Sequence, residues 1–546
     1  MIKNTLYIVM AAMAAVRTEA QNAGLSRQVE VIKEYVPDAG VAMPKVDFVP
    51  QIGDTTLLRP EMEYGIRPTG YVGRFGIPDI APMTVSVDEY KFVMPFYIKA
   101  GAGYPWNGLL DFYWSHRDRY NIGYGAYYNH DGRYGKATSD LGLRRKALTA
   151  TNYAGGFASK EFGRYVLKAG IDMFFNEYTA YGAYTIDSLP LNSYGANERF
   201  NYKGISGDVT FGDTFTDLSR LNFRLGGRLG TTANTVQQTD TKSEFFGEIG
   251  KAFRQHTAIL SARVRSYCGS DARSYFTLEP RYAVEGVDFT LDAGLKVNFG
   301  SGLRLFPQLN LKYDVWGGYI IPYVEIDGGL TCGDMERMLE LNPYVVRGIL
   351  KIADLKQYNL RGGVAGSLSD NLYYKAFVGV SSLLDMSFFV SDYSEGRTAR
   401  FLVERDNGTM FTLGGSMEFK LYDKLRSWAA ARYYGYTLDH FERACGLPNF
   451  EVRVGGRYEF TPKWRASLGA TLLGRRYFFE RIASTGDLLL NKARPSFNLE
   501  AQVDYRHSRF IHYFLRGENL FNSKLYPWNH YRSVGLTVQG GVVLSF

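Results

Sequence analysis

Segments of about ten residues in which apolar and polar side chains alternate recur along most of this chain. Residues 289–299, FTLDAGLKVNF, are a clear example, because every second side chain is apolar and those between them are polar, charged or Gly. Residues 450–460 and 497–505 follow the same pattern. Successive side chains of a β-strand point to opposite faces of the sheet. Each segment therefore predicts a strand with one apolar face and one polar face.

The type of sheet follows from where the charges and the aromatic residues lie. A soluble antiparallel sheet with one wet face would also alternate. Here, however, the polar faces carry charges at mid-strand, and the apolar faces end in Tyr, Phe or Trp. Both features are typical of outer-membrane barrels, which have a hydrated lumen and aromatic girdles. The sequence thus predicts an all-β fold, a transmembrane antiparallel β-barrel.

Short polar turns alternate with longer connections along the chain. Short turns on the periplasmic side and long loops outside are typical of such barrels. Ten turns, with both chain ends in the periplasm, predict about 22 strands, within a range of 16 to 22. Residues 243–253 alternate poorly and are the least regular strand. The predicted turns are 115–121, 159–163, 215–219, 253–257, 284–288, 315–318, 368–371, 422–425, 461–463 and 507–509.

The N-terminus has the pattern of a secretory signal peptide. Lys3 precedes the apolar run Leu6–Val16, and small residues end at Ala20, where cleavage is expected. The run is too short to cross a bilayer as a helix, and no later run of about 18 apolar residues follows. Residues 1–20 are therefore predicted to be removed on export. Residues 21–90, in which prolines cluster, predict an extended arm in the periplasm or the lumen, and residues 91–546 the barrel.

The basic charge of the chain does not indicate a nucleic-acid ligand. The formal net charge is +8, but Lys and Arg are spread along the chain without a basic block. The expected partners are outer-membrane lipid and the machinery that inserts outer-membrane proteins. Other outer-membrane proteins or a surface lipoprotein are further candidate partners. The three cysteines, Cys268, Cys332 and Cys445, have no metal-binding spacing and are interpreted as unrelated thiols.

Motifs of hydrolases, metalloenzymes and nucleotide-binding loops do not occur. The sequence thus predicts no catalytic, cofactor or metal site and a protein that is not an enzyme. Basic side chains on predicted lumenal faces could line a passage for anionic solutes. The alternative, which we favour for each single residue, is that charges of a wide lumen satisfy one another. These candidates are Arg224, Arg228, Arg263, Arg265, Arg453, Arg457 and Arg465.

The chain ends on GLTVQGGVVLSF, which reads as a strand up to its last residue. Leu544 and Val542 lie on one face of this strand, with Phe546 at its end. A barrel must pair its last strand with its first, because an unpaired edge cannot face lipid. These three residues are therefore candidates for barrel closure.

Upstream of this strand stands ENLFN: Glu518, Asn519, Leu520, Phe521 and Asn522. In that position the motif resembles the last hairpin of TonB-dependent receptors. Residues 29–54 and 323–345 look like a group within that superfamily, the plug-less TonB-dependent receptor-like barrels of Bacteroidota. The resemblance implies an outer-membrane location and a terminal aromatic that serves as the assembly signal. Only about 70 residues separate Gln21 from the first predicted barrel strand, too few for a receptor plug.

Two functions of different kinds remain open from the sequence. The resemblance favours solute transport, or a receptor role, across the outer membrane. The lack of a plug favours a non-transporting structural or assembly subunit of an outer-membrane protein complex, since an open pore of this width would harm the cell. An enzyme acting at the barrel rim is a distant third.

Overall fold

The structure is a computed structural model. The predicted signal peptide and the arm of residues 21–90 lie outside the residues that it describes. Described residues are 95–138, 144–182, 198–215, 218–235, 238–268, 272–300, 302–347, 354–392, 400–421, 424–481 and 487–546.

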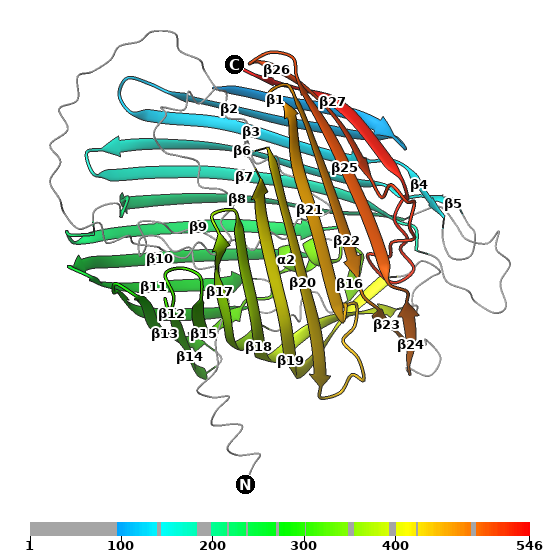
Figure 1. Cartoon of the computed structure of the whole chain (residues 1–546). Coiled ribbons are helices and arrows are strands. Elements are labelled where there is room, and N and C mark those ends of the chain that lie inside the picture. Colours follow the sequence, from blue (N-terminus) through cyan, green and yellow to red (C-terminus); the bar gives the residue numbers. More distant parts are fainter. Residues whose placement is uncertain are drawn as a thin grey trace.

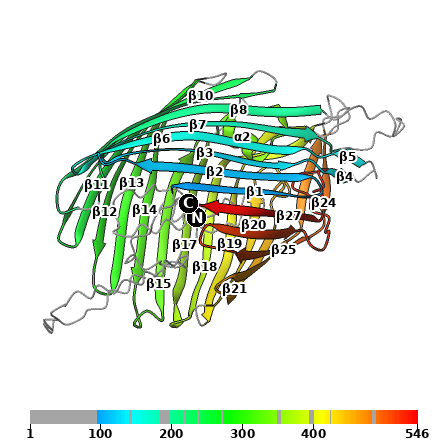
Figure 2. The ribbon, with the colours of Figure 1, turned by 90° about the horizontal axis from the view of Figure 1, so that it is seen from above.

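Antiparallel strands form one closed ring, seen from the side and from above (Figures 1 and 2). The ring contains 22 strands, as expected from the sequence. They are β1 (Phe96–Tyr104), β2 (Asn107–Arg117), β3 (Ile122–Arg133), β6 (Thr149–Phe162), β7 (Tyr165–Ala180), β8 (Glu198–Asp213), β9 (Asn222–Asn234), β10 (Thr239–Phe253), β11 (His256–Cys268), β12 (Arg273–Glu285), β13 (Phe289–Gly300), β14 (Gly302–Tyr313), β15 (Ile321–Thr331), β17 (Leu355–Ser369), β18 (Leu372–Asp392), β19 (Arg400–Leu421), β20 (Leu425–Leu438), β21 (Phe450–Thr461), β22 (Trp464–Leu473), β25 (Ser496–Arg506), β26 (Ile511–Glu518) and β27 (Thr537–Ser545).

The ring closes between the first strand and the last. Tyr97–Tyr104 of β1 pairs antiparallel with Val538–Ser545 of β27. Beyond this ladder, Phe96 and Phe546 exchange two backbone hydrogen bonds of 2.9 and 3.0 Å. Their rings stack with centroids 4.9 Å apart. The regular chain end seen in the sequence is therefore the strand that closes the barrel.

Turns are short at one end of the ring, and most connections are longer at the other. Each of the ten predicted turns joins two neighbouring wall strands at the same end. The poorly alternating residues 243–253 do form a strand, β10. We call the opposite end the mouth. There lie the small hairpin of β4 (Lys136–Thr138) and β5 (Arg144–Lys146), the hairpin of β23 (Arg476–Arg481) and β24 (Leu488–Ala493), and β16 (Val345–Arg347).

Strand β9 shows why alternation produces this wall. Leu225 and Leu229 are 55% and 56% exposed on one face. Arg224 and Arg228, on the other face, reach Glu248 and Asp172 of other strands. A barrel in a bilayer needs apolar side chains outside and tolerates charge inside, so the period of two fixes which face is which.

Helix α2 (Met335–Leu341) belongs to the connection between β15 and β17. Its first turn is capped by Asp334, whose carboxylate accepts a hydrogen bond from the Arg337 backbone N–H. Both views place α2 inside the ring of strands (Figures 1 and 2). Among the described residues, no helix is long and apolar enough to cross a membrane.

Candidate functional site

Residues 332–347, which we call the mouth segment, cross the interior of the barrel at its mouth. Their side chains share one buried cluster with Tyr178 of β7, Phe200 of β8 and Phe401 of β19. In ring order, β7 and β19 are the fifth and the sixteenth of the 22 wall strands, so they lie on opposite sides. The mouth segment therefore bridges opposite walls.

Two tyrosines lie at the centre of this apolar cluster. Tyr344 of the mouth segment and Tyr531 of the β26–β27 connection are fully buried, with ring centroids 4.0 Å apart and an interplanar angle of 22°. Trp528 Nε1 donates to the Leu341 carbonyl over 3.1 Å. The Phe401 N–H donates to the Tyr344 carbonyl, also over 3.1 Å. Two connections far apart in sequence are thus packed together over the lumen.

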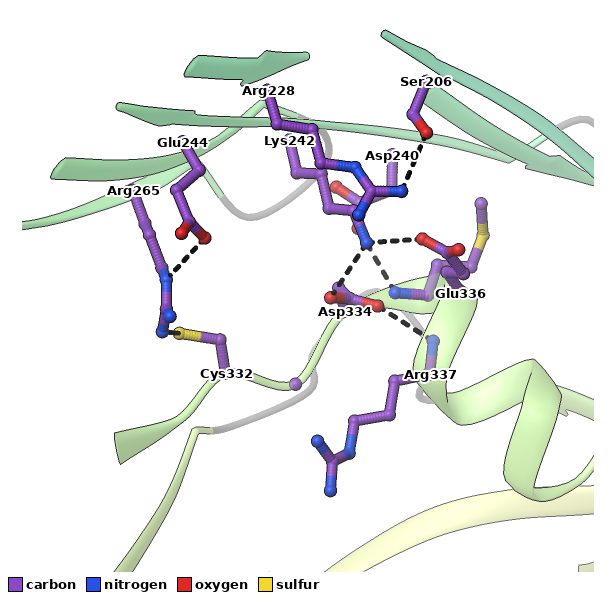
Figure 3. Close-up of polar contacts among 12 residues, drawn as sticks. Ser206, Arg228, Asp240, Lys242, Glu244, Arg265, Cys332, Asp334, Glu336 and Arg337 are labelled. Atoms are coloured by element: carbon purple, nitrogen blue, oxygen red, sulfur yellow. Dashed lines mark hydrogen bonds and ion pairs between the residues drawn. The ribbon is translucent and has the colours of Figure 1, made fainter. Parts of the chain in front are cut away.

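A charged contact attaches α2 to β10 of the wall (Figure 3). The Lys242 ammonium of β10 pairs with Glu336 and lies 3.6 Å from the Asp334 carboxylate. Next to it, Asp240 Oδ2 accepts a hydrogen bond from the Met335 backbone N–H over 3.2 Å. The side chains of Lys242 and Glu336 are 31% and 23% exposed, so the pair is only partly hydrated. We call Lys242, Asp334 and Glu336 the charged anchor.

The start of the mouth segment is held by β11 and β12. Arg273 of β12 donates to the Gly333 carbonyl and lies 3.5 Å from the Asp354 carboxylate. Tyr275 of the same strand donates to Asp354, which also accepts from the Gly333 N–H over 3.0 Å. Both backbone polar groups of Gly333 are therefore held, its carbonyl by Arg273 of β12 and its N–H by Asp354, which directly precedes β17.

Burial keeps the Tyr344 hydroxyl and the Cys332 thiol of the mouth segment neutral. It raises the pKa of Tyr344 well above its usual value, with smaller effects from Tyr181 and Tyr531. Burial and Asp354 also raise the pKa of the Cys332 thiol. A protonated thiol is a poor nucleophile and metal ligand. Cys268, Cys332 and Cys445 are all free.

A second polar cluster ties the β23–β24 hairpin to the β26–β27 connection. Glu480 of β23 accepts hydrogen bonds from Asn529 and His530 over 2.7 Å each and from Asn491 over 3.1 Å. Asn529 also donates to Ser391 Oγ of β18 over 3.0 Å. Because Tyr531 follows His530 directly, this cluster positions one half of the stacked tyrosine pair.

Acid should weaken this cluster. Burial alone would raise the pKa of Glu480, but hydrogen bonds from His530, Asn529 and Asn491 lower it below the usual 4.5. A carboxylate with a lowered pKa stabilises the fold above its unfolded pKa, and this contribution is lost as pH falls through the folded value. We therefore expect faster proteolysis of the β26–β27 connection below about pH 4.5. Glu480→Gln should abolish that acid dependence, whereas Glu442→Gln, at a solvent-exposed carboxylate, should not.

Most of the predicted basic residues lie beside carboxylates. Arg224 Nε is 3.1 Å from Glu248, Arg263 Nε is 3.2 Å from Glu244, and Arg265 Nε is 2.9 Å from Glu244. Arg228 lies 3.6 Å from Asp172, Arg453 Nε 2.7 Å from Glu451, and Arg465 2.9 Å from Glu459. Arg457 stands opposite Ser467 in the β21–β22 ladder. Arg265 also contacts the mouth segment, where its guanidinium lies 3.9 Å from Cys332 Sγ.

The ENLFN motif forms the end of β26 and the turn that follows. Glu518 pairs with Arg133 and Arg516 at 3.1 and 2.7 Å. Asn519 is buried, has a φ of +49°, and holds the turn through hydrogen bonds with Ser523 of 2.8 and 2.9 Å. Asparagine tolerates this left-handed conformation better than most residues. Leu520 donates its N–H to the Leu499 carbonyl over 3.0 Å.

The last two residues of the ENLFN motif lie in the turn after β26, and the predicted closing residues Leu544 and Val542 lie in β27. Phe521 is 67% exposed, and its ring lies tilted beside that of Phe497 with centroids 5.8 Å apart. Asn522, with a φ of +52°, accepts from the Leu536 N–H over 3.3 Å. Leu544 and Val542 stand opposite Ile98 and Ala100.

Removal of Phe546 should reduce assembly more than it reduces the stability of assembled barrel. The ring is 53% exposed and makes one stack with Phe96, and the residue adds two backbone hydrogen bonds at the end of the ladder; each of these contacts contributes about 1 kcal/mol. A role in recognition by the insertion machinery does not depend on that small energy. We expect a several-fold lower assembled fraction in cells, with nearly unchanged heat resistance of what does assemble. Phe546→Tyr should assemble normally, and equal loss of both properties in the deletion variant would contradict the prediction.

Several residues of this site escaped the sequence prediction. Lys242, Tyr344 and Tyr531 carry the contacts of the mouth segment, and none was a candidate. Residues 323–345 did stand out, but only as similar to a receptor-like group. The helical spacing of Met335, Met338 and Leu339 was the one local signal of a buried helix.

Comparisons with known proteins support the fold. No protein-family model matches the chain, and no curated protein sequence does. Among solved structures, the siderophore receptor PirA from Acinetobacter baumannii superposes with a TM-score of 0.64 at 11% identity, covering 83% of this chain and 80% of that one. A mutant of the ferric enterobactin receptor PfeA from Pseudomonas aeruginosa gives 0.62 at 13% identity, with the same two coverages. The ferric-catecholate import receptor Fiu from E. coli K12 gives 0.58 at 10% identity, covering 83% and 82%.

Identities this low show the fold alone. The chain is a closed 22-strand barrel with the architecture of siderophore receptors.

Proposed function

We propose that this protein is an outer-membrane barrel that passes a solute through its lumen, with the mouth segment as its gate. The observation that carries the proposal is the contact of this one segment with opposite walls of a receptor-sized barrel. Likeness in fold to siderophore receptors supports a transport or receptor role. The signal peptide and the resemblance to TonB-dependent receptors support the outer-membrane location.

The way the mouth segment is held suits a gate. Its apolar side packs on the β26–β27 connection, and its charged side pairs with β10 through Lys242. The Lys242–Glu336 pair is only partly buried, so water and salt still reach it and weaken it in part. A partner that competes for Lys242 or for Glu336 could thus release one side of the segment while the wall stays intact.

A second function, as a non-transporting subunit of an outer-membrane complex, is favoured by the same apolar cluster. Fully buried side chains such as Tyr344 and Phe401 are typical of a permanent core rather than of a surface that opens. In that case the barrel would serve as a scaffold, with its mouth closed over for structural reasons.

Ion conductance in planar bilayers separates the two functions. Thr331 and Leu355 are register partners in the β15–β17 ladder, so a tight Gly/Asn turn can replace residues 332–354 without disturbing the wall. If the segment is a gate, wild-type protein should conduct little and the shortened variant should conduct steadily. Heat-modifiable migration on a gel would confirm that the variant is folded.

Silence of both proteins would contradict transport through the lumen. Co-purification of the wild-type barrel in a stoichiometric complex from native membranes would then support the scaffold function. Steady conductance by the wild-type protein would instead contradict the gate.

A further inference from the structure

Backbone pairing in the wall is weakest between β14 and β15. Their ladder contains four residue pairs, Leu309–Lys312 with Tyr323–Ile326. The next shortest ladder in the ring, between β25 and β26, contains six, and the β13–β14 ladder contains twelve. Between Leu303 and Gln308, β14 thus has register partners on β13 but none on β15 among the described residues.

Prolines explain where pairing fails. Pro307 lies two residues beyond the last pair of the β14–β15 ladder, Leu309 with Ile326, on the mouth side. Pro280 lies in the same cross-strand row, and the β12–β13 ladder is interrupted at Glu279 and Pro280. Proline has no N–H to donate, so each removes a hydrogen bond from its ladder. The β13–β14 hairpin is therefore loosely attached on both flanks at this level.

The two faces of residues Leu303–Gln308, the part of β14 without described partners on β15, carry different side chains. Leu303 and Leu305 are 60% and 49% exposed on the apolar face. Phe306, on the other face, is buried and packs on Tyr358 of β17, 5.0 Å between centroids. The Phe306 ring of β14 therefore reaches across β15 to β17. On β15, the register partner of Tyr358 is Gly328, which has no side chain in the way. The aromatic ring thus fills the place where pairing is missing.

Polar groups without hydrogen-bond partners lie beside Phe306. Lys296, its register partner on β13, is 4% exposed, and its ammonium has no hydrogen-bond partner. Gln308 Oε1 and Asn310 Oδ1 on β14 also lack one. Glu279 and Asp327 are within electrostatic range of Lys296 without a hydrogen bond to it in the structure. A buried charge that makes no hydrogen bond is costly, so this place is suited to a ligand with complementary oxygen atoms.

We propose that the wall opens laterally between β14 and β15 and takes up an anionic amphiphile with an acyl chain. Its carboxylate or phosphate oxygen accepts from Lys296 inside, and its chain passes Phe306 toward the bilayer. Opening at this ladder separates four register pairs, fewer than at any other ladder between described wall strands. The inference does not depend on transport through the mouth, because it concerns the wall alone.

The test uses photoreactive amphiphiles in native outer membranes. A diazirine analogue of palmitate and a phospholipid with the same diazirine acyl chain are added separately, and labelled peptides are mapped by mass spectrometry. We expect labels on lumenal side chains of β13 and β14 that excess unlabelled palmitate or phospholipid displaces. The probe that labels them identifies the head group as carboxylate or phosphate.

Matched variants make the outcome decisive. Phe306→Ala should increase lumenal labelling several-fold, whereas Phe377→Ala, in a strand whose ladders contain 13 and 19 pairs, should not. Lys296→Met should reduce labelling by an anionic probe about tenfold and leave a long-chain alcohol probe unaffected. Pro307→Val, which restores a donor, should reduce labelling.

Labels confined to the lipid-facing residues would overturn the proposal. Lumenal labels of equal strength on β10, or labelling unchanged in Phe306→Ala and Pro307→Val, would overturn it as well. Heat-modifiable migration of each variant shows that the barrel is folded.

Discussion

Tyr344→Ala should release the mouth segment and leave the barrel wall folded. Tyr344 is 1% exposed and stacks on Tyr531, so its loss leaves a cavity at the centre of the cluster. Removing a fully buried aromatic side chain typically costs about 3–5 kcal/mol. Wall strands keep their ladders, because none of them depends on this ring.

Hydrogen exchange measured by mass spectrometry checks this expectation. Amides of residues 335–347 and 528–531 should exchange much faster in Tyr344→Ala, while those of the wall strands should be unchanged. Tyr120→Ala, at an exposed tyrosine in the β2–β3 turn, is the matched control and should change neither. If the released variant also conducts in bilayers, the gate is supported. Faster exchange without conductance would favour the scaffold function instead.

Lys242→Gln should loosen the charged side of the mouth segment. It leaves Asp334 and Glu336 close together next to Asp240 without the ammonium between them. Loss of a hydrogen bond to a charged group, with its partners left behind, typically costs about 1–3 kcal/mol. The increase in hydrogen exchange of the mouth segment should therefore be smaller than in Tyr344→Ala. High salt should reduce the difference in exchange between Lys242→Gln and wild type, because salt screens the charge pair in the wild-type protein.

The control and the pairing test use the same strand. Lys251→Gln changes an ammonium of β10 that lies over the Phe253 ring, and it should leave the mouth segment unaffected. The double variant Lys242→Gln/Glu336→Gln should be destabilised by less than the sum of its two single variants, because neither charge is then left unpaired. Simple additivity would show that the two residues do not act as a pair.

Much of the wall could be predicted because its signal is local. In Phe289–Gly300, and in strands like it, lipid on one side and water on the other impose an alternation that is visible over a few residues. A shift by one residue would turn every apolar side chain inward, so the register is fixed as well. The ten turns and the closing strand followed from the same pattern. Strand β10 alternates less regularly than the others because its polar face includes Phe246 and its apolar face includes Lys251.

The candidate site could be predicted only in part. Arg265 was named from its place in an alternating strand, and it does contact the mouth segment through Cys332. Lys242, which lies across the site from Arg265, was not named. Its importance comes from its contact with Glu336, which is 94 residues away in sequence. The weak β14–β15 ladder also went unnoticed, since Pro307 alone does not show whether a neighbouring strand is paired.

The sequence by itself determined the strands, the turns at one end and the closure of the ring, because each depends on side chains that are close along the chain or at its very end. Only the tertiary structure decided that residues 332–347 cross the mouth, that Tyr344 meets Tyr531 and that the wall is weakest beside Lys296. These features are contacts between distant segments. No local pattern specifies them, since a buried aromatic or lysine has the same sequence signature wherever its partner comes from.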